Sequence, residues 1–368
     1  MSTELNVMVV DDSALYRHIL TTAVAAIPGC TVAATAPNGA IALQKMERTR
    51  PDLVLLDCEM PVLGGLETLT EIRRRFPETV VVMVSGVNQN AAAVTFEALN
   101  RGAIEFIPKP EGATAAASEA LLRERLRHVC GVSAALSHSV SSSTKAEGGS
   151  RAKSGAASPS ADGAKALRAN TPARVDAVVI GISTGGPNAL AKLLPLLPAR
   201  LGVPVLIVQH MPPYFTSCLA KSLGKHSAMP VLEGVDGAEV QPDQIVLAPG
   251  GHHMALRRDG RKLRIALNED APVKNCRPAV DVLFRSAAEH YGANALAIVM
   301  TGMGDDGCDG ARVLRARGAR CITQSRETCV IYGMPRALVD AGLSDESLPI
   351  EGLADRIAAL AAPQRSCA

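Results

Sequence analysis

The sequence predicts two α/β domains, each built around a parallel or mostly parallel sheet and joined by a flexible linker. With 368 residues, the chain is longer than one domain usually is. Both halves alternate short apolar runs with helical patterns, which is typical of parallel strands connected by helices. Between them, residues 133–171 consist mainly of Ser, Ala, Gly, Lys and Pro, so they cannot bury enough apolar surface to offset their chain entropy. We therefore expect domains at 1–130 and 173–368, with a flexible linker at 131–172.

The overall composition excludes several classes of protein. The 38 basic and 36 acidic residues give a net charge of +2 without any Lys/Arg block, and nine aromatic residues offer few stacking platforms, so we expect no nucleic-acid binding. No apolar run reaches the roughly 18 residues that a membrane helix needs, and the first residues lack the basic region of a signal peptide. The nine cysteines form no C-x-x-C pair. These observations favour a cytoplasmic protein without membrane insertion.

The first domain has five apolar runs, which predict a flavodoxin-like doubly wound sheet. The predicted strands are 6–10, 31–36, 53–57, 80–85 and 104–109. Polar side chains stand where four of these strands end, which is where such sheets place their sites. These side chains belong to Asp11, Asp12, Asp57, Ser85 and Lys109.

Three carboxylates at one edge of a sheet would repel each other unless a cation lay between them. Oxygen ligands of this kind suit Mg²⁺, which also accepts phosphate oxygens. A lysine and a hydroxyl nearby could then hold a phosphoryl group placed on Asp57. The residues therefore predict a magnesium-dependent phosphoacceptor site, against the alternative that each acid is a solvated loop residue.

Four short motifs of this domain resemble those of the receiver domain of two-component response regulators. The motifs are Val-Val-Asp11-Asp12-Ser, Asp57-Cys-Glu-Met-Pro61, Ser85-Gly and Lys109-Pro110. The resemblance implies that a histidine kinase phosphorylates Asp57 and that Lys109–Pro110 is a cis peptide bond. It also implies a Mg²⁺ ion held by Asp11, Asp12, Asp57 and the carbonyl of Glu59, with switch positions at Ser85 and Phe106.

The second domain opens on a strand that ends in a glycine-rich turn containing a serine. Its predicted strands are 177–182, 205–209, 244–247, 295–301 and 319–323. Gly181, Ser183 and Gly185 fit the pattern G-x-S-x-G, in which a small-residue turn exposes a nucleophilic hydroxyl beside a helix N-terminus. Backbone N–H groups there favour a developing oxyanion. An ordinary glycine-rich turn is the alternative, and a phosphate cradle lacks the lysine that it needs.

A histidine and an aspartate follow other strands of the same domain. His210 comes directly after 205–209, and Asp305 and Asp306 lie in the glycine-rich segment after 295–301, so all should reach the edge that carries Ser183. We expect His252 and His253 to be mobile after a turn, and Asp176 and Asp281 to lie on the wrong side or too far away.

The chain order Ser…His…Asp differs from the Ser…Asp…His order of α/β-hydrolases. That order would require His252, His253 or His290 as the base, and none of these follows a predicted strand. The residues therefore predict a hydrolase-type triad on another scaffold, of Ser183, His210 and either Asp305 or Asp306. A strand-end histidine that merely bonds a backbone carbonyl is the alternative for His210.

Six stretches of the second domain resemble the chemotaxis protein-glutamate methylesterase/glutaminase family, in which a receiver domain is fused to a serine hydrolase. They are Gly-Ile-Ser183-Thr184-Gly-Gly, Gln209-His210-Met-Pro, Ala248-Pro-Gly, Arg277-Pro-Ala-Val-Asp281-Val-Leu-Phe, Thr301-Gly-Met303-Gly-Asp-Asp306-Gly and Cys329-Val-Ile-Tyr-Gly-Met334-Pro335. The resemblance implies Asp306 as the triad acid, oxyanion help from the backbone at Met303, and Thr184 close to the nucleophile.

The resemblance also implies a function. The substrates would be methylated glutamates and glutamines on chemoreceptors, the phosphodonor a chemotaxis histidine kinase, and the activating event phosphorylation of Asp57. Ester hydrolysis would need no metal. The alternatives are a transcriptional regulator, which would need a helix-turn-helix after the linker, a non-catalytic signalling adaptor, and a small-molecule esterase.

Overall fold

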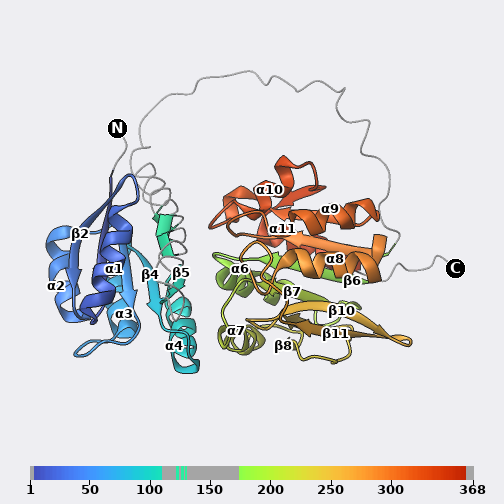
Figure 1. Cartoon of the computed structure of the whole chain (residues 1–368), viewed down its shortest axis with the longest axis horizontal. Coiled ribbons are helices and arrows are strands. Elements are labelled where there is room, and N and C mark those ends of the chain that lie inside the picture. Colours follow the sequence, from blue (N-terminus) through green and yellow to red (C-terminus); the bar gives the residue numbers. More distant parts are fainter. Residues whose placement is uncertain (1–3, 110–121, 124–125, 128, 131–173, 362–368) are drawn as a thin grey trace, which may run out of the picture.

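The computed structural model describes residues 4–109, 122–123, 126–127, 129–130 and 174–361. The predicted linker at 131–172 and Pro110, with its predicted cis bond, lie outside these residues. Figure 1 shows the N-terminal domain, coloured blue to cyan, beside the C-terminal domain, coloured green to red.

The N-terminal domain is a five-stranded parallel sheet flanked by helices, with the strand order β2-β1-β3-β4-β5. This order is that of the flavodoxin-like fold, so the predicted fold class is confirmed. The strands are β1 (Leu5–Val10), β2 (Cys30–Ala36), β3 (Leu53–Asp57), β4 (Val80–Ser85) and β5 (Glu105–Pro108). The helices are α1 (Ala14–Ala25), α2 (Gly39–Thr49), α3 (Gly65–Arg75) and α4 (Gln89–Asn100).

Local sequence explains these elements. Every residue of β3 and β4 is buried, as expected for central strands with helices on both faces. Ser13, Asn38 and Asn88 each accept a backbone hydrogen bond from the first turn of the next helix, at α1, α2 and α4. Strand ends and helix starts are thereby fixed close to the polar side chains at the carboxyl edge of the sheet.

The C-terminal domain contains a seven-stranded sheet of order β14-β13-β12-β6-β7-β9-β8, in which every paired strand is parallel. The strands are β6 (Ala177–Ile182), β7 (Val205–Gln209), β8 (Val231–Glu233), β9 (Ile245–Leu247), β12 (Ala295–Val299), β13 (Arg320–Gln324) and β14 (Glu346–Leu348). An antiparallel hairpin joins β10 (His253–Asp259) to β11 (Lys262–Asn268). The helices are α6 (Gly186–Leu193), α7 (Phe215–Gly224), α8 (Val280–His290), α9 (Cys308–Ala316), α10 (Met334–Asp340) and α11 (Ile350–Ala361), with short 3₁₀ turns η1 (Leu194–Leu196), η2 (Gly292–Asn294) and η3 (Arg326–Thr328).

The five strands predicted for this domain are present, whereas β8, β14 and the hairpin were not predicted. The edge strands β8 and β14 have three residues each, one of them a glutamate, and the hairpin strands mix apolar with charged residues. The expected mobility of His253 is wrong. This side chain is 1 % exposed at the start of β10, where its Nδ1 accepts the N–H of Ala279 at 3.2 Å.

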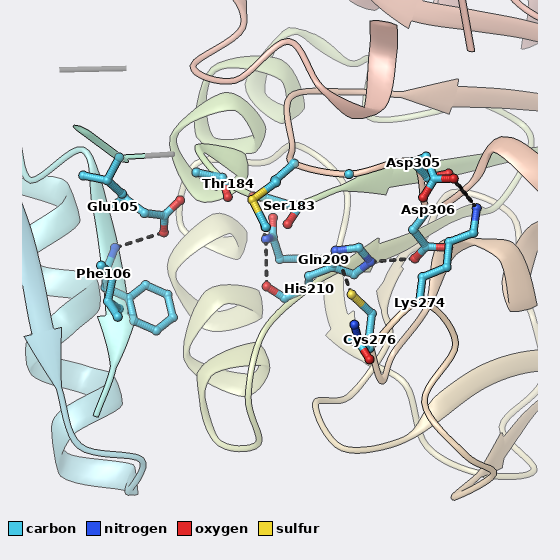
Figure 2. Close-up of a pocket in the computed structure, with 15 residues that line it drawn as sticks. Glu105, Phe106, Ser183, Thr184, Gln209, His210, Lys274, Cys276, Asp305 and Asp306 are labelled. Atoms are coloured by element: carbon cyan, nitrogen blue, oxygen red, sulfur yellow. Dashed lines mark hydrogen bonds and ion pairs between the residues drawn. The ribbon is translucent and has the colours of Figure 1, made fainter. Parts of the chain in front are cut away.

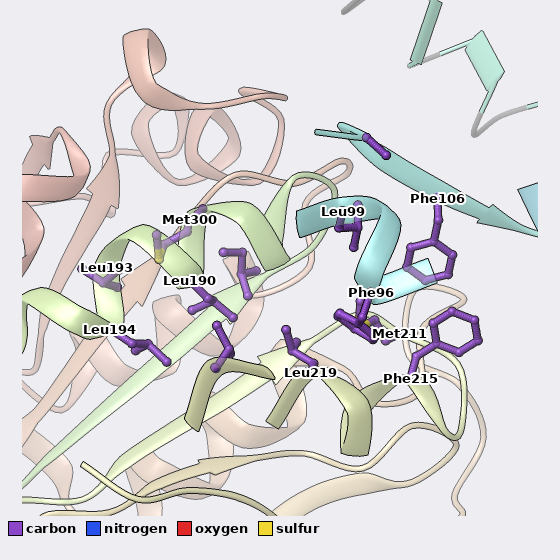
Figure 3. Close-up of a cluster of buried hydrophobic side chains, with 14 of the residues drawn as sticks. Phe96, Leu99, Phe106, Leu190, Leu193, Leu194, Met211, Phe215, Leu219 and Met300 are labelled. Carbon is purple, nitrogen blue, oxygen red and sulfur yellow. The ribbon is translucent and has the colours of Figure 1, made fainter. Parts of the chain in front are cut away.

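The two domains pack through the β5 side of the N-terminal sheet. Helix α4 packs against α6 and α7 of the C-terminal domain (Figure 1). Phe106 of β5 stacks on Phe215 of α7, with ring centroids 4.6 Å apart and an interplanar angle of 3°, and Phe96 of α4 lies 6.3 Å from the same ring. These rings join Leu99, Leu190 and Leu219 in one apolar cluster shared by both domains (Figure 3).

Candidate active site

The turn after β6 holds Ser183 in a fixed backbone conformation. The Ser183 N–H donates to the Thr301 carbonyl at 3.0 Å, and the Gln209 side chain donates to the Ser183 carbonyl at 2.9 Å. Gly185 has φ of +77°, and a Cβ there would lie 2.6 Å from Val330, so both conformation and space require glycine. The serine is therefore presented directly before the N-terminus of α6.

His210 and Asp306 meet beside this turn. His210 follows β7, and its Nε2 lies 2.7 Å from Oδ2 of Asp306 (Figure 2). The other sequence candidate, Asp305, is 64 % exposed and pairs with Lys274 at 3.0 Å instead. The structure thus places Asp306, and not Asp305, against the imidazole.

The Asp306 carboxylate is held by backbone groups as well as by the histidine. It accepts the N–H groups of Val280 (2.7 Å), Asp281 (2.9 Å) and Gly307 (2.9 Å). Val280 and Asp281 begin α8, where a helix favours negative charge. Burial raises the pKa of Asp306, but the His210 contact and these N–H groups lower it by more, so the carboxylate is stabilised as an anion.

Contacts around the imidazole of His210 also determine its pKa. Burial lowers the pKa of His210, but hydrogen bonds with Asp306 and Cys276 raise it by more, to about 9. The imidazolium form, which appears when the ring takes a proton, is therefore stabilised. Because Nε2 faces Asp306, Nδ1 is the ring nitrogen left for another partner; the Sγ of Cys276 lies 3.6 Å from it, and Ser183 lines the same cavity (Figure 2).

Asp281 lies closer to this site than we expected from the sequence. Its side chain is fully buried, its own N–H bonds Asp306, and its carboxylate accepts the N–H of Gly310 at 2.6 Å. Lys274 lies 3.3 Å from the same carboxylate. The prediction that Asp281 is too far away is therefore wrong, because the start of α8 approaches the edge of the sheet; its carboxylate, however, is paired with Lys274 and Gly310.

The predicted catalytic and oxyanion residues share one cavity of about 310 Å³. The C-terminal domain contributes Ser183, Thr184, His210, Met303 and Asp306 to its lining. The Thr184 carbonyl accepts the Thr301 hydroxyl at 2.9 Å, which ties this turn to the segment that carries Met303. Five side chains from three segments that are far apart in sequence thus line one cavity.

The N-terminal domain forms the rest of the cavity wall through β5. Glu105, which was not predicted as a site residue, is 9 % exposed. Its Oε1 accepts the N–H of Phe106 at 2.9 Å (Figure 2), and its Oε2 accepts the N–H of Gly185 at 2.7 Å. A buried carboxylate is costly unless it is hydrogen-bonded, so this contact ties the two domains. The signal in the sequence is an acid within the apolar run 104–107.

A second group of predicted residues meets at the carboxyl edge of the N-terminal sheet. The Nζ atom of Lys109 lies 2.9 Å from a carboxylate oxygen of both Asp11 and Asp57. Asp12 completes a set of three carboxylates with oxygens within 4.8 Å of one another. Burial raises the pKa of Asp57 to about 6; Lys109 opposes this shift and Asp11 adds to it.

Two more predicted residues of this domain, Ser85 and Glu59, lie at the same edge of the sheet, whereas Phe106 lies at the domain interface. Ser85 is buried at the end of β4, where its hydroxyl accepts the hydroxyl hydrogen of Thr95 at 2.9 Å. The backbone of Glu59 hydrogen-bonds the Asp57 carboxylate. The donor set at the edge consists of hard oxygen atoms, which fit a Mg²⁺ ion.

The chain is similar to known proteins over both of its domains. Residues 178–357 match the CheB methylesterase family, and residues 7–119 match the response regulator receiver domain. A protein-glutamate methylesterase/protein-glutamine glutaminase of Desulfotalea psychrophila is 41% identical over 355 residues, covering 96% of this chain and 97% of that protein. The chain belongs to this methylesterase/glutaminase family. A relative of the same description from Trichodesmium erythraeum is 37% identical and covers 96% of the chain.

The second domain is also similar to a solved structure from the methylesterase/glutaminase family. The crystal structure of the Thermotoga maritima CheB methylesterase catalytic domain is 39% identical, covers 50% of this chain and 98% of that chain, and gives a TM-score of 0.50. The family and the fold class predicted from the sequence are therefore confirmed. In the part of the chain that the structure describes, no helix has both the length and the apolar character needed to cross a bilayer.

Proposed function

We propose that this chain hydrolyses the γ-methyl esters of glutamate side chains, and the amides of glutamine side chains, on cytoplasmic segments of chemoreceptors. The observation that carries the proposal is the 2.7 Å contact between His210 and Asp306 inside the cavity that Ser183 also lines. The names of the two relatives describe both activities. Residues 1–130 would then form the receiver and 173–368 the methylesterase domain, with 131–172 between them.

In this mechanism His210 serves as base and then as acid. Nδ1 takes the hydroxyl proton of Ser183 as the oxygen bonds the carbonyl carbon of the ester or amide. The ring gives that proton to the leaving group as its bond to the carbonyl carbon breaks, which releases methanol from an ester or ammonia from a glutamine. Asp306 holds the proton on Nε2 and stabilises the imidazolium. A water molecule, deprotonated by the same nitrogen, then attacks the acyl-serine and releases glutamate.

The backbone around the serine stabilises the tetrahedral oxyanion. The turn that carries Thr184 and Gly185 leads into α6, whose first N–H groups favour negative charge. Met303 lines the same cavity, and its backbone would supply a further N–H to the oxyanion. No residue of this set needs a metal ion for its role.

The receiver would control access to this cavity. Glu105 and Phe106 are in the same strand, β5, and Lys109 directly follows that strand and contacts the proposed phosphorylation site, Asp57. A Mg²⁺ ion held by Asp57 and its acidic neighbours would neutralise phosphoryl oxygens donated by a histidine kinase. A phosphoryl group on Asp57 would displace the Lys109 contact and shift β5 through the switch positions Ser85 and Phe106, which uncovers Ser183.

Methanol release from methylated receptor membranes tests the hydrolytic proposal. We expect Ser183→Ala to lower the rate by about 10⁴-fold or more, whereas the matched control Ser347→Ala, an exposed position on β14, retains it. Equal rates of methanol release for wild type and Ser183→Ala would favour a non-catalytic adaptor. Faster turnover of p-nitrophenyl esters than of receptor would favour a small-molecule esterase.

A fragment that begins at Arg174 tests the control by occlusion. The catalytic domain of the Thermotoga maritima relative was solved as a separate domain, which supports independent folding of this part. We expect the fragment to hydrolyse receptor esters faster than the unphosphorylated full chain. Equal rates would contradict occlusion without affecting the assignment of the triad.

A further inference from the structure

Cys276 lies in the cavity, yet the proposed mechanism does not use it. Its Sγ is 3.6 Å from Nδ1 of His210, and it is a free thiol (Figure 2). A tight turn holds it there: Val273 and Cys276 exchange two backbone hydrogen bonds, and Lys274 and Asn275 between them have φ of +50° and +61°. Two non-glycine residues in the left-handed region indicate that the surrounding structure holds this turn in place.

The two facing atoms are a ligand pair that suits a thiophilic divalent cation. A thiolate and an imidazole nitrogen are the usual ligands of Zn²⁺. For Zn–N of about 2.0–2.1 Å and Zn–S of about 2.3 Å in a tetrahedral site, the two ligand atoms stand roughly 3.6 Å apart. The Nδ1–Sγ distance in this structure is 3.6 Å. An ion could therefore bind both atoms with little movement of either side chain.

Asp306 is the hydrogen-bond acceptor that a metal-binding histidine usually has at its second ring nitrogen. Ligating histidines commonly donate the second ring N–H to a carboxylate, which fixes the tautomer and the ring orientation. The 2.7 Å contact between Nε2 and Asp306 has this form, and the potential ligand atoms of His210, Cys276 and Asp306 all lie within 4.8 Å of one another. Asp306 already accepts three backbone N–H groups, so we assign it the outer position.

The surroundings leave room for an ion and do not repel it. The positive charge of Lys274 is shared among Asp281, Asp305 and Asp309, at 3.0–3.3 Å from each carboxylate. The cavity of about 310 Å³ allows water to complete the coordination. With two protein ligands instead of four, such a site would bind metal reversibly.

We propose that Cys276 Sγ and His210 Nδ1 bind a thiophilic divalent cation of the Zn²⁺ class, and that the bound ion inhibits hydrolysis by occupying the nitrogen that Ser183 needs. Binding forms Zn–S and Zn–N bonds, breaks the S–H bond of Cys276 and releases that proton to solvent, together with any proton on Nδ1. No electron is transferred. The inhibition rests on the proposed function, whereas the binding does not.

Titration of the reduced full-length chain with Co²⁺ tests the binding. We expect a near-ultraviolet thiolate-to-cobalt charge-transfer band in wild type that is lost in Cys276→Ala and in Cys276→Ser. The matched control is Cys30→Ala, because Cys30 lies on β2, outside the cavity, where it hydrogen-bonds another thiol, that of Cys130. A band that persists in both Cys276 variants, or that disappears in Cys30→Ala, would overturn the proposal. Circular dichroism establishes that the variants are folded.

Inhibition by Zn²⁺ is measured separately as methanol release from methylated receptor membranes. We expect Zn²⁺ to inhibit wild type and Cys30→Ala, and a chelator to restore the rate of both. For Cys276→Ala, we expect the same degree of inhibition to require a Zn²⁺ concentration at least about tenfold higher. Equal Zn²⁺ sensitivity of wild type and Cys276→Ala would overturn the inhibitory role. A chain without esterase activity would instead disprove the proposed function, and the cobalt band would still decide the binding.

Discussion

The stacking of Phe106 on Phe215 predicts how strongly the receiver covers the cavity. Phe106 is 5 % exposed, and Phe106→Ala removes its ring from the domain interface. Losing the burial of a large apolar side chain costs about 1.5–3 kcal/mol, and losing an aromatic pair about 0.5–1.5 kcal/mol more. The covered state should therefore be destabilised by about 2–4.5 kcal/mol. At 1.36 kcal/mol per tenfold change, the ratio of open to covered molecules rises by roughly 30- to 2000-fold.

The assay is methanol release by the unphosphorylated full chain. We expect Phe106→Ala to raise the basal rate by this factor, up to the rate of the fragment that begins at Arg174. Phe76→Ala is the matched control, because Phe76 is equally buried in the N-terminal domain but stacks under Arg50 and Arg75 instead of at the interface. A basal rate for Phe106→Ala that equals wild type, while phosphorylation still activates, would refute the assigned role of this stack.

Three further substitutions test the site. Asp306→Asn should lower kcat by about 10⁴-fold because the amide stabilises the wrong imidazole tautomer, and single-turnover rates that match wild type would contradict this. Gly302→Ala would place a Cβ 2.8 Å from that of Ser183, so we expect a loss of at least about 100-fold in kcat, with receiver phosphorylation unchanged in a radiolabel assay. Asp57→Asn should keep the basal rate but abolish activation by a phosphodonor; activation that survives would place the phosphoryl group elsewhere.

The sequence alone predicted the central strands and the polar residues at their carboxyl ends. Buried parallel strands are nearly continuous apolar runs, so β3, β4, β6 and β7 can be recognised in the sequence. Because the strands within each sheet are parallel, their carboxyl ends lie at one edge of that sheet. Ser183 and His210 could be selected in this way without any knowledge of side-chain direction. The short edge strands and the hairpin of the second domain could not, because their residues are too few or too mixed in polarity.

Tertiary structure decided which side chains of these loops face one another. Asp305 and Asp306 are adjacent in sequence, and their residue type cannot separate them; only the approach of α8, whose N–H groups hold one carboxylate, places Asp306 on the imidazole. Which histidine nitrogen faces the acid is likewise a matter of packing. Glu105 and Gly185 are 80 residues apart in sequence, and Cys276 and His210 are 66 residues apart, yet each pair is in contact. Such contacts arise from long-range packing, about which local sequence patterns carry no information.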